Sequence, residues 1–124
     1  ESLTRVFNVP IVVGENTRKL FPAAGYRELG LVKIKGKQNL ARVFEPSQTG
    51  MDPDSTLLAK TQRHNTALAH YYQRQWLDAQ TIFRRLAEAD PADPLYKYYL
   101  ERIDTFMRVP PPDDWRGELR FTVA

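Results

Sequence analysis

The sequence predicts an α+β fold, and three observations support that prediction. Between residues 26 and 45, apolar and polar side chains alternate in two runs joined at residues 36–39, which is typical of a β-hairpin. From residue 57 to residue 107 the apolar side chains recur with helical spacing. A polar linker with glycine and proline, residues 47–56, separates the two patterns. With 124 residues, the chain has the length of about one domain.

The first 46 residues predict, in order, a helix, a strand, a short helix and two strands. Residues 3–8 have the spacing of the last turns of a helix, and residues 9–13 (VPIVV) form an apolar run typical of a buried strand. Residues 14–17 supply a turn and an N-cap for a short helix over residues 17–21. Three strands with one partial helix bury too little apolar surface to be stable alone.

The predicted hairpin has one apolar side and one basic side. Period-2 alternation places Val32 and Ile34 on the side that packs. A glycine inside a strand often marks a bulge, so Gly30 predicts an irregular register there. The basic side carries Lys33, Lys35 and Lys37.

Residues 57–108 predict three helices, over about 57–74, 76–89 and 93–108. The breaks fall at residues 74–75 and at the Asp-Pro pairs of residues 90–94, where proline cannot continue a helix. Small and aromatic side chains in the first two helices resemble one tetratricopeptide repeat, with the third helix as its cap. The residues that carry this resemblance are Ala67, Tyr71, Trp76, Ala79, Phe83, Leu86 and Pro91.

The tail, residues 109–124, has three consecutive prolines after Val109, which impose an extended backbone. We expect Trp115 to dock on the helices or on the hairpin, and residues 119–123 to form a terminal strand at a sheet edge. Exposed strand edges favour pairing with other chains. We therefore expect either a homodimer or an arrangement in which residues 119–123 and the helices cover the sheet.

Several function classes find little support. The chain has no cysteine, which excludes disulfides and a cysteine nucleophile. Eight Lys/Arg against four Asp/Glu give residues 1–46 a net charge of +4, whereas ten against eleven give residues 47–124 a net charge of −1; this does not predict nucleic-acid binding. His64 and His70 are six residues apart and do not share a helix face, so we expect packing or surface roles. The aspartates beside prolines and turns predict turn and cap chemistry rather than a metal site; they are Asp90, Asp93, Asp113 and Asp114.

Three segments of the hairpin region follow one another in a recognisable order: residues 27–30 (RELG), 32–37 (VKIKGK) and 43–46 (VFEP). Together with the elements over residues 3–18, they resemble the C-terminal end of class III nucleotidyl cyclase catalytic domains, mostly bacterial adenylate cyclases. The later part, with its single helical repeat and its Pro-Pro-Pro-x-x-Trp ending, is similar to the extension that follows the cyclase domain in bacterial members.

The resemblance implies a ferredoxin-like domain that acts as a head-to-tail dimer and converts ATP to cyclic AMP and pyrophosphate with two divalent cations, Mg²⁺ or Mn²⁺. In that family the first lysine of the Lys-Gly-Lys hairpin contacts nucleotide phosphates, and Lys35 stands at this position. The open alternative is a solvated hairpin lysine, as expected for Lys33 and Lys37.

The family's metal ligands, purine-selecting residues and late-helix Asn and Arg would precede Glu1. We therefore expect residues 1–46 to be the last part of a cyclase domain, inactive alone, within a cytoplasmic enzyme that an upstream region can tether to the inner membrane. The alternative function is a helical-repeat module, in which residues 57–108 bind a protein partner.

Overall fold

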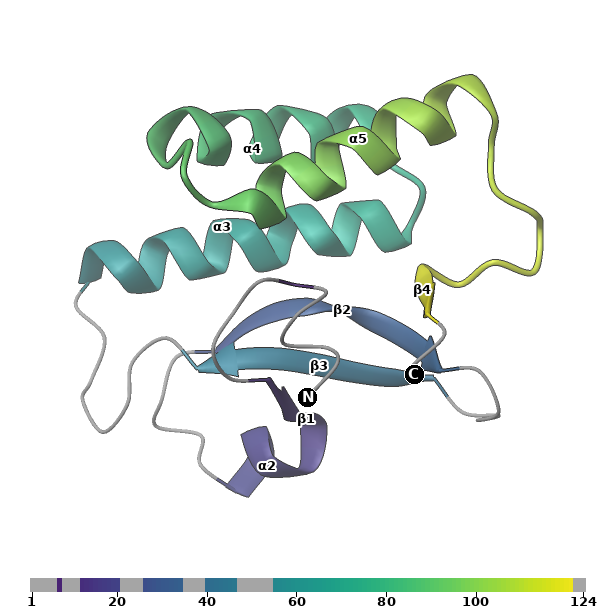
Figure 1. Cartoon of the computed structure of the whole chain (residues 1–124). Coiled ribbons are helices and arrows are strands. Elements are labelled where there is room, and N and C mark those ends of the chain that lie inside the picture. The colour runs from purple at the N-terminus through teal and green to yellow at the C-terminus, as the bar shows by residue number, and fades with distance from the viewer. Residues whose placement is uncertain (1–6, 8–11, 21–25, 35–39, 47–54, 122–124) are drawn as a thin grey trace.

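The computed structural model describes Phe7 and residues 12–20, 26–34, 40–46 and 55–121. A four-stranded mixed sheet carries three long helices on one face, and a short helix lies on the other side of the sheet (Figure 1). The predicted α+β fold is confirmed. In chain order the elements are β1 (Val13–Gly14), α2 (Glu15–Leu20), β2 (Tyr26–Ile34), β3 (Ala41–Pro46), α3 (Ser55–Tyr72), α4 (Trp76–Ala89), α5 (Pro94–Arg108) and β4 (Glu118–Phe121).

The strands lie in the order β1-β3-β2-β4, with β3 antiparallel to both of its neighbours and β4 parallel to β2. The register between β2 and β3 shifts between Glu28 and Gly30, so the predicted bulge is confirmed. Position 30 has no room for a side chain, because a Cβ atom at Gly30 would lie 2.5 Å from the Tyr99 hydroxyl and 3.0 Å from Leu119. The bulge thus lets α5 and β4 approach the sheet closely.

The outer edge of β2 is covered along its length by this same chain. From Leu31 onward β4 pairs with it. Before that point, side chains of the helices take the place of a strand. The Glu28 amide donates to Asn65 Oδ1 at 3.0 Å, His64 Nε2 lies 2.6 Å from the Glu28 carbonyl, and the Tyr99 hydroxyl donates to the Leu29 carbonyl at 2.5 Å. Backbone groups that would otherwise invite another strand are therefore satisfied internally.

The three long helices lie within two residues of their predicted positions. α3 ends at Tyr72 because Arg74 adopts a left-handed backbone with φ of 63° and the Gln75 amide returns to the His70 carbonyl. α5 begins after Asp93, whose carboxylate caps the Leu95 amide at 3.0 Å, with proline in the first turn. Five of the seven residues that carry the repeat pattern are buried, namely Ala67, Tyr71, Ala79, Phe83 and Leu86. Trp76 is half-buried, and Pro91 is exposed just after the end of α4.

The tail returns to the helices, as predicted. Trp115 is 9% exposed and packs against Tyr71, Trp76 and Phe106, while its Nε1 donates to the Glu118 carbonyl at 3.1 Å. The Arg74 guanidinium donates to four carbonyls of the tail, the shortest at 2.6 Å. These contacts place β4 beside β2, so the described residues realise the second of the two expected arrangements; the homodimer stays a prediction.

Three details were predicted wrongly, two of them in the early chain. Gly14 belongs to β1, where it pairs with Val43, rather than to a turn. The short helix begins at Glu15 instead of residue 17, and Glu15 forms an ion pair with Arg18 one turn later. α3 likewise begins at Ser55, inside the predicted linker.

Some predictions fall outside the described residues. They are the helix over residues 3–6, most of the strand over 9–13, the hairpin turn at 36–39, most of the linker and the last three residues. In the part of the chain that the structure describes, no helix is long and apolar enough to cross a membrane.

Candidate functional site

The one residue to which the sequence assigned a ligand, Lys35, lies outside the described residues, as does Lys37. Lys33 lies on β2 and is half-buried. Its neighbour Val32 is buried in the core, so the predicted alternation of an apolar and a basic side holds at these two positions. Phosphate binding by Lys35 stays a prediction.

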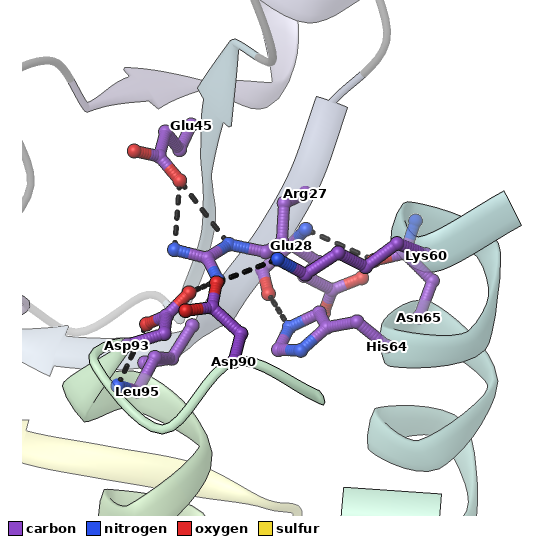
Figure 2. A network of polar contacts seen from close by, with 9 residues as sticks. All are labelled: Arg27, Glu28, Glu45, Lys60, His64, Asn65, Asp90, Asp93 and Leu95. Atoms are coloured by element: carbon purple, nitrogen blue, oxygen red, sulfur yellow. Dashed lines mark hydrogen bonds and ion pairs between the residues drawn. The ribbon is translucent and has the colours of Figure 1, made fainter. Parts of the chain in front are cut away.

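The described residues instead bring charged side chains together where the hairpin meets the helices (Figure 2). We call this set the junction network. It joins two strands, the middle of α3 and the turn between α4 and α5. Its members are Arg27 of β2, Glu45 of β3, Lys60 and His64 of α3, and Asp90 and Asp93 of the α4–α5 turn.

Arg27 is the centre of the network. Its guanidinium binds Glu45 through two nitrogens, at 2.8 and 3.1 Å, and forms an ion pair with Asp93. The same guanidinium lies 5.6 Å from the centre of the Tyr96 ring. Burial lowers the pKa of Arg27, but the carboxylates of Asp93 and Glu45 outweigh burial and leave that pKa raised. A single permanent cation thus links the hairpin to the start of α5.

Lys60 and Asp90 form a second, more exposed pair. Lys60 Nζ lies 2.6 Å from Asp90 Oδ2, with the two side chains 33% and 35% exposed. Burial is the largest single influence on the pKa of Lys60 and lowers it, but the hydrogen bond to Asp90 and the attraction of nearby Tyr96, Asp90 and Asp93 together leave that pKa raised. The same hydrogen bond lowers the pKa of Asp90. This pair fastens the end of α4 to the first half of α3.

His64 is the buried member of the network, and a packing role is what the structure gives it. Because a carbonyl only accepts, Nε2 must carry the proton that it shares with the Glu28 carbonyl, and Nδ1 is then unprotonated. Among the described residues Nδ1 has no hydrogen-bond partner. The ring packs against Phe83 and Tyr96. Burial lowers the pKa of His64 to about 3, so the ring is neutral at physiological pH.

The junction network has the chemistry of a structural link that holds the hairpin against the helices. Each of its charged groups faces an opposite charge, and its histidine is enclosed by aromatic rings. No three side chains of His, Cys, Asp or Glu among the described residues are placed to hold a metal ion. The two divalent cations implied by the resemblance to cyclases therefore have no fitting ligand set in this part of the chain, and no step of chemistry can be assigned to them here.

A pocket of about 460 Å³ lies between α2 and the sheet, bordered by Arg18, Glu28 and Arg42. Both arginines are already engaged. Arg18 pairs with Glu15, and Arg42 donates to the Glu28 carboxylate at 2.7 Å. The Tyr72 hydroxyl donates to the same carboxylate at 2.6 Å. Because its cations are neutralised in place, this pocket offers little attraction to an anionic ligand.

The junction network was not predicted from the sequence, although one of its ion pairs could have been. Arg27 and Glu45 lie opposite each other in the predicted hairpin, so that pair could have been found from the register alone. Asp93 was correctly assigned to cap chemistry, but its contact with Arg27 spans 66 residues of sequence and depends on how the helices dock.

Comparisons of the chain with protein-family models, with curated proteins and with solved structures found no match.

Proposed function

We propose that this chain is the C-terminal portion of a class III adenylate cyclase, in which the β2–β3 hairpin belongs to the catalytic domain. One observation carries the proposal beyond the resemblance in sequence. Arg27 and Glu45, which belong to two of the segments that resemble the cyclases, are partners across the hairpin and form an ion pair there. The segments are thus parts of one local structure.

In this proposal Lys35, just after β2, provides a positive charge for the triphosphate of ATP. The residues that would bind metal and stabilise the transition state come from segments before Glu1. The helices then hold the hairpin from one side, through the junction network at one end and through β4 at the other. Their role is to keep the hairpin at a fixed angle to the rest of the catalytic sheet.

An assay of cyclic AMP formation from ATP, with Mg²⁺ or Mn²⁺, tests this proposal on the 124-residue chain and on the full product of its gene. We expect no turnover by the 124-residue chain and measurable turnover by the full product. In the full product, Lys35→Ala should lower kcat/KM at least about tenfold, because a phosphate contact in the transition state is lost. Lys33→Ala, a matched change two residues earlier in the sequence, should alter kcat/KM less than about twofold. A full product that forms no cyclic AMP would refute the proposal.

A second candidate function is a helical-repeat module that binds a protein partner. It is favoured by the packing of α3 against α4, in which Ala67 and Ala79 are fully buried and allow the two helices to approach closely. The sequence immediately before Glu1 distinguishes the two candidates. An Asn-x-x-x-Arg helix preceded by strands bearing aspartate supports the cyclase, and further 34-residue helical repeats support the module.

A further inference from the structure

An open groove of about 950 Å³ runs between α3 and α4. Its residues recur at helical spacing on both helices, with Ala59, Arg63 and Thr66 on α3 and Ile82, Leu86 and Ala89 on α4. Positions i, i+4 and i+7 lie on one helix face, so the groove follows the two helices for about seven residues, or about 10 Å. Alanines at its one end keep it open, because they carry no side chain beyond Cβ.

The floor of the groove is apolar, and its rims are basic. Leu86 is buried at the base, and Ile82 is half-buried beside it. Arg63 on one rim and Arg85 on the other are exposed, and neither forms an ion pair within the described residues. No acidic side chain among the described residues lines the groove, and α3 contains no Asp or Glu from Ser55 to Tyr72. Lys60 adds a further cation at one end, although Asp90 neutralises it.

We propose that this groove binds an acidic amphipathic peptide segment of a partner protein. Apolar side chains of the segment would cover the accessible apolar residues Ala59, Ile82 and Ala89. Its Asp or Glu side chains would meet Arg63 and Arg85. A nucleic acid fits less well, because the described residues that line the groove include no aromatic side chain on which a base could stack. The groove has this chemistry whether or not the chain belongs to a cyclase, so the cyclase assay and the binding test can fail separately.

Fluorescence polarisation tests this binding with a labelled peptide of about twelve residues, which as a helix spans about 18 Å and covers the groove. The peptide carries leucine and alanine on one helical face and glutamate on the flanks. A second peptide has lysine in place of each glutamate. The protein is the 124-residue chain, as wild type, as Arg63→Glu, as Arg85→Glu and as the matched control Arg84→Glu. Arg84 is the exposed neighbour of Arg85 and does not line the groove.

We expect saturable binding of the glutamate peptide that weakens as NaCl is raised, and no saturable binding of the lysine peptide. Arg63→Glu and Arg85→Glu should each weaken binding at least about tenfold, and Arg84→Glu less than about twofold. Circular dichroism should show the same helical content in every variant. Equal losses in all three variants would mean attraction to net charge alone and would overturn the proposal. So would absence of saturable binding of the glutamate peptide, or tighter binding of a single-stranded RNA of similar length.

Discussion

The two ends of the helical layer are fastened to the sheet by opposite kinds of chemistry. At the start of α5 the junction network uses ion pairs centred on Arg27. At the other end an aromatic cluster, defined as Tyr71, Trp76, Phe106 and Trp115, holds the tail and places β4. Rings tolerate small shifts and are indifferent to pH and salt, whereas ion pairs require fixed partners and respond to both. We therefore expect the aromatic end to supply most of the stability and the charged end to fix the angle of the helices.

The largest expected effect tests the aromatic end. Trp115→Ala removes a nearly buried ring that lies 5.0 Å from Phe106 and 5.4 Å from Tyr71, centre to centre. We expect the free energy of unfolding to fall by about 3–5 kcal/mol, measured by urea denaturation. Trp115→Phe keeps part of the contact and should cost less than half as much. A loss of under about 1 kcal/mol for Trp115→Ala would contradict the assigned role of the aromatic cluster.

The next largest effect tests the charged end. Arg27→Met leaves the carboxylates of Glu45 and Asp93 largely buried without their cation, and we expect a loss of about 3 kcal/mol in the free energy of unfolding. The control is Arg18→Met, because the Arg18–Glu15 pair is 36% and 39% exposed; its loss should stay below about 1 kcal/mol. Equal losses in the two variants would show that burial does not distinguish the two arginines.

The aromatic end and the charged end also differ in how much of each could be predicted from the sequence. The aromatic end and the helices were predictable, because helical spacing and Pro-Pro-Pro-x-x-Trp are local patterns that report burial. The burial of Val32 and the bulge at Gly30 follow from strand rules, and a strand-like run predicts the terminal strand at a sheet edge. Its parallel pairing with β2 was not predicted. The junction network was missed, because Asp93 reads locally as a cap and meets Arg27 only after the helices have docked. His64 shows the same limit: spacing excluded a shared metal face with His70 but could not identify the Glu28 carbonyl as its partner.

A pH titration separates the two ends further. The pKa of His64 is about 3 in the folded chain and about 6.5 when unfolded, so between these values the unfolded state binds the extra proton. Stability therefore decreases as pH falls below about 6.5, by up to about 1.4 kcal/mol per pH unit. Arg27 opposes protonation of the ring, and Asp93 favours it only weakly. Urea denaturation from pH 7 to pH 5 should show a loss of about 2 kcal/mol in the wild type.

The matched variant for that titration is His64→Gln, which can still donate a hydrogen bond to the Glu28 carbonyl but does not titrate. Its stability at pH 7 should be lower than that of the wild type, since the ring contacts with Phe83 and Tyr96 are lost. Its loss between pH 7 and pH 5 should be much smaller. Identical pH dependence in both proteins would show that His64 is not the group responsible.

The smallest expected effect concerns the Lys60–Asp90 pair of the junction network, which is more exposed than the Arg27–Asp93 pair of the same network. Lys60 and Asp90 are about one third exposed, so water and salt screen their attraction. A double-mutant cycle with Lys60→Met and Asp90→Asn should give a coupling energy of about 0.5 kcal/mol that is nearly abolished in about 0.5 M NaCl. The same cycle on Arg27→Met and Asp93→Asn should give a larger coupling that survives the salt, because both side chains are at least 85% covered and Asn at position 93 can still cap α5. If salt abolished both couplings equally, the charged end would be a surface feature, and the angle of the helices would have to be set by the aromatic cluster alone.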